Sequence, residues 1–169
     1  MTEAVILTMN ENIIEIYHGS NMIVENPVII PFSRPLDFGA GFYVTTFYHQ
    51  AKRWAEKKTN RYDGSATVNK YDLNLSGLKI KEFKKPNNAW IDFVVSNRKT
   101  NEVLNHNFDI IIGEVANDQV FDSIQLYIDN IYTRAQLIKA LKIKIENNQL
   151  CLATAKALAN LTFKGADLL

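Results

Sequence analysis

The sequence N-I-I-E-I-Y at residues 12–17 runs directly into His18-Gly19-Ser20. This short β-branched run predicts a buried strand that ends at the histidine-glycine-serine triplet. Pro27, Pro31 and Pro35 interrupt the following stretch, so we expect a loop there. After the loop, residues 41–45 predict a second strand.

Working outward from these two strands, the rest of the chain alternates strands and helices irregularly. The apolar spacing over residues 47–58 predicts an amphipathic helix that carries Trp54. Further strands are predicted at 66–75, 78–83, 108–112 and 149–153, and further helices at 90–103, 120–130, 134–141 and from Thr154 through Leu161. Thr133 and Thr154 are suited to cap the last two helices. Because strands and helices do not alternate strictly, the pattern favours an α+β fold over a doubly wound parallel sheet.

Length and composition narrow the class of protein. The 169 residues fit a single domain, 1–169, that buries a core without metal or disulfide staples. With 19 basic and 18 acidic residues, the net charge of +1 provides no overall attraction to nucleic acid or membrane. Cys151 is the single cysteine, so we expect a small buried hydrophobe rather than a disulfide. No secretory signal or membrane span is recognisable, and we expect a cytoplasmic protein with no membrane partner.

Several familiar motifs are present only in part. Asp37-Phe38-Gly39 spells the metal-binding triplet of protein kinases, but the glycine-rich loop and catalytic loop are missing. Gly39-Ala40-Gly41 begins a dinucleotide fingerprint that lacks its third glycine. The three histidines, at 18, 49 and 106, do not have metal-ligand spacing, so we expect no metal.

Two segments together have the groups that a nicotinamide riboside needs. Glycine allows a bare backbone to approach the carboxamide, and an imidazole at a strand end can bond ribose hydroxyls. Aromatic faces stack on the cationic pyridinium ring, which together is worth about 1–2 kcal/mol. The segments are Tyr17-His18-Gly19-Ser20 and the run from Phe38 to Thr45, which a helix with Trp54 follows.

These segments resemble the NAD-binding signature of the diphtheria-toxin and poly-ADP-ribose-polymerase branch of ADP-ribosyltransferases. The resemblance implies an ADP-ribosyltransferase-like split β-sandwich with flanking helices, and NAD as co-substrate. It assigns the ribose contact to His18, the carboxamide to the backbone of Gly19, and the nicotinamide face to Tyr43, with Trp54 as the second aromatic. Ser20, Gly41 and Phe42 complete the matched NAD-binding segments.

The whole chain also resembles a family of small bacterial proteins that are related to these transferases and have no assigned function. The shared features are Tyr17-His18-Gly19-Ser20, Asp37-Phe38-Gly39, Gln50-Ala51 with Trp54-Ala55, Asn97-Arg98 and the run from Gly113 to Asp118. Small stand-alone domains of this type are often bacterial toxins. The resemblance therefore implies a protein or nucleic-acid acceptor of ADP-ribose, and a neutralising antitoxin protein as partner.

The third position of the signature departs from the pattern. The transferase branch usually places a glutamate on a late strand, where it bonds ribose and stabilises the cation formed as nicotinamide leaves. The positional match here is Gln149, and Glu146 lies three residues earlier. A neutral amide can bind the hydroxyl but supplies no negative charge. Asp118 is an expected helix cap, or a further cleft residue together with Asn117.

Each candidate also has a structural interpretation. His18 can serve only to satisfy backbone groups, Tyr43 is an ordinary strand aromatic in most proteins, and Trp54 has the position of a core residue on its helix. The favoured hypothesis is an NAD-dependent mono-ADP-ribosyltransferase in which His18, Tyr43 and Gln149 carry the reaction. The alternatives are a catalytically inactive NAD- or ADP-ribose-binding module, and a purely structural protein whose glycine motifs are turns.

Overall fold

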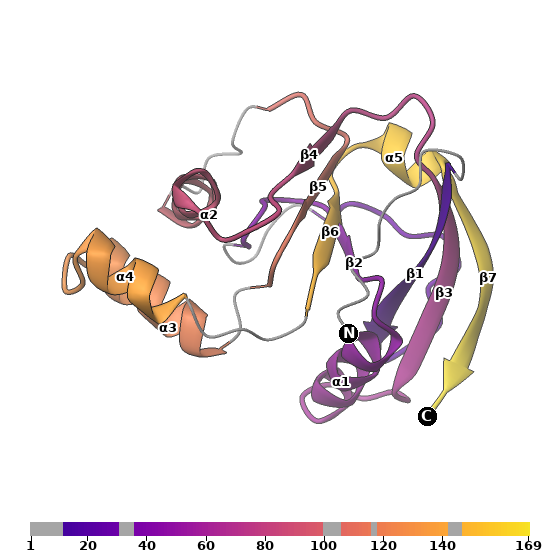
Figure 1. The fold of residues 1–169 in the computed structure, drawn as a ribbon. Coiled ribbons are helices and arrows are strands. Elements are labelled where there is room, and N and C mark those ends of the chain that lie inside the picture. The colour runs from indigo at the N-terminus through magenta and orange to yellow at the C-terminus, as the bar shows by residue number, and fades with distance from the viewer. Residues whose placement is uncertain (1–11, 31–35, 100–105, 116–117, 142–146) are drawn as a thin grey trace, which may run out of the picture.

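The computed structural model describes residues 12–30, 36–99, 106–115, 118–141 and 147–169, which form two sheets and five helices (Figure 1). In chain order the elements are β1 (Ile13–Ser20), β2 (Phe42–Val44), α1 (Tyr48–Thr59), β3 (Thr67–Asn74), β4 (Ile80–Glu82), α2 (Asn88–Lys99), β5 (Ile110–Gly113), α3 (Asp118–Ile128), α4 (Arg134–Ala140), β6 (Gln149–Leu152), α5 (Ala155–Ala159) and β7 (Leu161–Leu168). The mixed α+β class predicted from the sequence is confirmed.

The strands form one three-stranded and one four-stranded sheet. The first has the order β1-β3-β7 and is antiparallel throughout. The second has the order β2-β6-β5-β4, and only its β4–β5 pair is parallel. Among the described residues, a single bridge between Tyr17 of β1 and Thr45 joins the two sheets through their backbones.

The core consists of two apolar layers, one on each face of the four-stranded sheet. Successive residues of a strand point to opposite faces, so Ile110 and Ile111 belong to different layers. The layer between the sheets includes Ile16, Phe42, Val44, Tyr71, Leu73, Ile110, Leu150 and Leu152. The other layer lies under the helices on the far side of the sheet and includes Phe38, Trp90, Ile91, Val94, Ile111, Ile124, Leu137 and Cys151. Cys151 is therefore a buried core residue, as predicted.

The helix ends follow their local sequence. Thr133 and Gln136 form a reciprocal capping box at the start of α4, and the Thr154 side chain accepts a hydrogen bond from Ala157 N at the start of α5. Both caps were predicted. The side chain of Asn87 accepts from Trp90 N and caps α2, which begins two residues earlier than expected.

The C-terminal region differs most from the prediction. The last helix ends at Ala159, and Leu161–Leu168 forms β7, an additional strand at the edge of the three-stranded sheet. Leu161 and Phe163 alternate with exposed Thr162 and Lys164, which is the period-two pattern of a strand. The chain turns at residues 76–77, between the two strands predicted at 66–75 and 78–83, but the corresponding strands β3 and β4 lie in different sheets.

Helix α1 lies directly on β1 at Gly19. A Cβ atom on Gly19 would lie 2.0 Å from Ala51 O and 2.8 Å from Ala55 N. Ala51 and Ala55 are themselves buried small residues on the inner face of α1. Glycine and alanine together therefore allow the two backbones to approach closely, which gives Gly19 a structural role whatever binds beside it.

We predict that Gly19→Ala lowers the free energy of unfolding by about 3 kcal/mol, because the new methyl group would displace the backbone of α1. For a domain of this size that corresponds to a fall of roughly 6–12 °C in the midpoint of thermal unfolding. Glu15→Gln, at an exposed position on the same strand, keeps an acceptor for the Tyr17 hydroxyl. It is the control and should shift the midpoint by less than about 2 °C. An unchanged midpoint in Gly19→Ala would show that the helix does not approach β1 this closely.

Candidate nucleotide-binding site

The His18-Gly19-Ser20 triplet forms the end of β1, where the two sheets meet. Tyr17 N donates to Thr45 O at 2.8 Å, and Thr45 N donates to Tyr17 O at 3.0 Å. On the opposite edge of β1, Leu75 N donates to Asn12 O. Backbone groups alternate between edges along an antiparallel strand. Even-numbered residues of β1 therefore bond β3, whereas the N–H and C=O of Tyr17 and Gly19 point toward β2.

Beyond the Tyr17–Thr45 bridge the backbone pairing stops. A continued ladder would pair Gly19 with Tyr43, but Tyr43 O instead contacts His18 Nδ1 at 2.7 Å. Within the described residues, no hydrogen bond to the N–H or C=O of Gly19 from the β2 side is found. The result is a short open edge with one donor and one acceptor, next to an imidazole.

The hydrogen bond to Tyr43 O fixes the tautomer of His18. A carbonyl oxygen only accepts, so Nδ1 carries the hydrogen and Nε2 of the neutral ring is an acceptor. Burial lowers the pKa of His18 to about 4, and the positive charge of Lys58 acts in the same direction. The ring packs on Phe42 with 4.5 Å between centroids. His18 is therefore a neutral hydrogen-bond acceptor at physiological pH.

Tyr43 and Phe42 point to opposite faces of β2. The Phe42 side chain lies in the core between the sheets, and Tyr43 packs against the layer under α2. The Tyr43 hydroxyl donates to Gly39 O at 2.7 Å and accepts from Phe38 N at 3.0 Å. Burial raises the pKa of this hydroxyl far above its usual value. His18 thus meets the backbone of Tyr43 and not its ring, while the hydroxyl holds the preceding turn.

Gly39 and Gly41 precede β2, and each has a different structural reason to be glycine. Gly39 has a φ of +84°, in the left-handed region that favours glycine. A Cβ atom on Gly41 would lie 2.4 Å from Cys151 Sγ and 2.8 Å from Leu152 O. Gly41 was predicted to contact NAD, but its close packing against β6 is sufficient to explain why a glycine stands there.

Trp54 lies half-buried on α1, on the same stripe as Gln50 and Lys58. The side chain of Gln50 forms two hydrogen bonds with the backbone of Asn148. Gln50 Nε2 donates to Asn148 O at 2.7 Å, and Asn148 N donates to Gln50 Oε1 at 3.2 Å. Lys58, one turn beyond Trp54, acts electrostatically on His18. This stripe of α1 therefore runs from the start of β6 toward His18.

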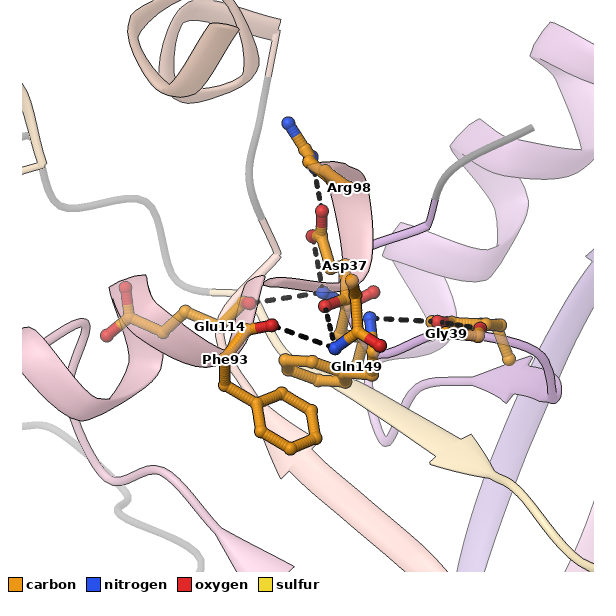
Figure 2. A network of polar contacts seen from close by, with 9 residues as sticks. Asp37, Gly39, Phe93, Arg98, Glu114 and Gln149 are labelled. Carbon is orange, nitrogen blue, oxygen red and sulfur yellow. Dashed lines mark hydrogen bonds and ion pairs between the residues drawn. The ribbon is translucent and has the colours of Figure 1, made fainter. Parts of the chain in front are cut away.

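Gln149 opens β6 and is held in a buried polar network (Figure 2). Its Nε2 donates to Asp37 Oδ2 at 2.7 Å and to the backbone oxygen of Glu114 at 3.2 Å. Asp37 also forms an ion pair with Arg98, and both side chains are more than nine-tenths buried. In the register of β2 with β6, Gln149 lies opposite Thr45, and Thr45 in turn lies opposite Tyr17 of β1. Gln149 is therefore two strand spacings, about 10 Å, from β1.

The remaining predicted residues are placed as follows. Ser20 is buried, with Oγ 3.5 Å from Asn21 Oδ1. Asp118 is the first residue of α3, two residues before the predicted start. Asn117 and Glu146 lie outside the described residues.

Sequence reasoning did not find the pairing of Asp37 with Gln149 or of Gln50 with Asn148. Asp37 and Asn97-Arg98 were named as shared features of the family resemblance. In the structure, Asn97 Nδ2 donates to the backbone oxygens of Asp37 and Phe93. The available signal for the environment of Asp37 was the adjacent pair Asn97-Arg98, because both of its side chains bond Asp37.

The described residues thus define an α+β protein of two sheets, with the His18 imidazole and the open edge of Gly19 at the place where the sheets meet. They include no group of three or more residues able to hold a metal ion, and none of their helices is long and apolar enough to cross a membrane. The chain belongs to the family of proteins of unknown function termed DUF3990, whose model matches residues 14–163. No curated protein and no solved structure matches the chain.

We predict that His18 titrates near pH 4 and not near its ordinary value of 6.5. Lys58→Ala should raise this pKa, since a neighbouring positive charge is removed, whereas Lys57→Ala should leave it nearly unchanged. NMR titration of the imidazole measures both effects. The unfolded chain binds a proton near pH 6.5 that the folded chain does not bind until about pH 4. The free energy of unfolding should therefore fall as pH decreases across that window. A His18 pKa near 6.5 would contradict the buried, neutral ring.

Proposed function

We propose that this protein is an NAD-dependent mono-ADP-ribosyltransferase and that its two sheets form the split β-sandwich of that superfamily. The observation that carries the proposal is the open edge of β1 at Gly19. One edge of a carboxamide presents an N–H donor beside the carbonyl acceptor, and the outward N–H and C=O of Gly19 complement both. Nicotinamide bound there would lie in the gap between β1 and β2, beside His18.

The neighbouring groups suit the rest of a nicotinamide riboside. Neutral His18 offers Nε2 as an acceptor for a ribose hydroxyl. Trp54, on the stripe of α1 between Gln50 and Lys58, provides an aromatic face, and Tyr43 provides a second. Stacking of the cationic pyridinium on such rings is worth about 1–2 kcal/mol.

The proposed reaction needs neither a metal nor a strong base. The bond between the nicotinamide nitrogen and ribose C1′ breaks, and both electrons leave with nicotinamide, which becomes neutral. A lone pair of the acceptor then forms the new bond to C1′, and the acceptor's proton passes to solvent. The protein contributes by holding the two halves of NAD in place and by facing the cationic sugar with oriented dipoles.

A second candidate function is a catalytically inactive NAD- or ADP-ribose-binding module. The observation that favours it is the identity of Gln149, a neutral amide in the third position of the signature. An amide dipole stabilises a cationic sugar less than a carboxylate does. This candidate predicts NAD binding without nicotinamide release.

The partners of the proposed transferase follow from the resemblance alone. They are a protein or nucleic-acid acceptor of ADP-ribose and, for a toxin of a bacterial toxin–antitoxin pair, a neutralising antitoxin protein. Incubation of the purified protein with NAD labelled on its adenylate phosphate and with cell lysate tests the acceptor. Chromatography of free nicotinamide tests bond cleavage in the same samples.

The outcomes separate the functions. Labelled macromolecule together with released nicotinamide supports the transferase. Binding of NAD by calorimetry without release supports the inactive module. Absence of binding at millimolar NAD, with no rise in melting temperature, would eliminate both.

We predict that Tyr43→Ala weakens NAD binding by roughly 1–3 kcal/mol, because the aromatic stack and its buried area are lost. Tyr43→Phe keeps the ring but removes the hydroxyl that bonds Phe38 N and Gly39 O. It should cost about 1–2 kcal/mol of stability and leave the NAD affinity within about threefold. Calorimetry and thermal unfolding measure the two quantities separately. If Tyr43→Ala binds NAD normally per folded molecule, the ring serves only the core.

A further inference from the structure

The orientation of the Gln149 amide is set by its neighbours. The carboxylate oxygen of Asp37 and the backbone oxygen of Glu114 both accept hydrogen bonds, so the atom that contacts them must be the NH2 nitrogen. Both amide hydrogens are thereby directed into the protein. Oε1 points away from these contacts, and no residue of the described part of the chain donates to it.

Asp37 can hold this orientation because it is itself fixed. Its side chain is 8% exposed and pairs with the Arg98 guanidinium, which is 6% exposed. Its backbone oxygen accepts from Asn97 Nδ2 at 3.2 Å, and Asn97 directly precedes Arg98 on α2. One carboxylate oxygen therefore faces Arg98 and the other faces Gln149 (Figure 2).

We propose that Asp37 is a positioning residue that makes Gln149 present its carbonyl, and not its NH2, to the bound ligand. The inference rests on the proposed function, in which the ligand group at this point is a ribose hydroxyl. Such a site selects a group that donates a hydrogen bond. It discriminates against a group of similar size that only accepts, such as fluorine.

Asp37→Asn reverses this geometry at almost constant shape. Arg98 holds the oxygen of the introduced amide, so the NH2 group of that amide faces the NH2 group of Gln149. Two donors cannot bond each other, so the Gln149 amide loses its shorter hydrogen bond and turns over, giving up the longer 3.2 Å bond to the backbone oxygen of Glu114. Its NH2 then faces the ligand, and selectivity for a hydroxyl over fluorine is lost.

Gln149→Glu alone places a second carboxylate against Asp37 at a separation of 2.7 Å in the present structure. Their repulsion should disfavour this variant, so the single change does not test the role of a charge at position 149. The double variant Asp37→Asn, Gln149→Glu keeps the net charge of the network, with one carboxylate and one guanidinium. The NH2 of the introduced asparagine donates to one oxygen of the introduced glutamate, and the other glutamate oxygen faces the ligand as an acceptor.

Two measurements test the proposal. The first is the 15N–1H spectrum of the Gln149 side-chain amide, assigned by comparison with Gln149→Ala, which requires no ligand. The second is the Kd of NAD and of NAD analogues in which each nicotinamide-ribose hydroxyl is replaced in turn by fluorine. Asp92→Asn is the matched control, because Asp92 forms an exposed ion pair with Arg134 and lies on α2, the helix that carries Arg98.

We expect solvent-protected Gln149 amide protons in the wild type and in Asp92→Asn, and exposed ones in Asp37→Asn. We expect the wild type to prefer NAD by at least about tenfold over one fluorinated analogue, since a buried acceptor that loses its donor is left unpaired. Asp37→Asn should lose that preference, and the double variant should regain it. Unchanged amide protection, or unchanged preference in Asp37→Asn, would overturn the proposal.

Two further outcomes are informative. If Asp37→Asn does not fold, failure of the double variant to fold better than Gln149→Glu would overturn the proposal as well. A wild type that does not bind NAD, with amide signals that shift as expected, would instead reject the proposed function and leave the orientation by Asp37 standing.

Discussion

Two backbone hydrogen bonds between Tyr17 and Thr45 hold the two sheets together and also determine where they part. One residue further along β1, the His18 ring takes the carbonyl of Tyr43 that a continued ladder would offer to Gly19. On the far side of Gly19, helix α1 lies so close that a methyl group would not fit. The open edge is therefore confined between a fixed helix and a fixed imidazole, and it is preorganised without any ligand. Preorganisation of this kind reduces the ordering cost of binding.

Burial keeps the groups around this edge neutral. It lowers the pKa of His18 to about 4, raises the pKa of Cys151 to about 12 and raises that of Tyr43 well above its usual value. The histidine therefore acts as a hydrogen-bond acceptor and the cysteine as a small apolar side chain. Neutral groups are poorly suited to general acid–base catalysis at neutral pH. They are compatible with a reaction whose leaving group departs from a positive charge, where binding and orientation do most of the catalysis.

The sequence predicted what depends on neighbouring residues and missed what depends on distant ones. The strand at His18, the helix carrying Trp54 and the caps at Thr133 and Thr154 are local patterns, and the structure has them within a few residues. The strand at Leu161–Leu168 also carried a local signal, but its short alternation is interrupted at Gly165. The bond from Gln149 to Asp37 spans 112 positions of the chain. No periodicity or spacing within one segment reports a contact of that length, and the same holds for Gln50 and Asn148.

The position of the negative charge distinguishes this site from one built around a glutamate. A carboxylate that accepts a hydrogen bond from an amide polarises it and increases the partial negative charge on the amide oxygen. Asp37 acts on Gln149 in this way, but Arg98 neutralises the same carboxylate from its other side. A ligand bound as proposed would therefore meet an oriented dipole backed by an ion pair, and not a full charge. In the proposed function, the orientation of the dipole would govern which group is bound, and the missing charge would limit how strongly a cationic sugar is stabilised. In the proposed transferase, Asp37 would therefore set which ligand group Gln149 binds, whereas the lack of a charge at position 149 would limit the rate of turnover.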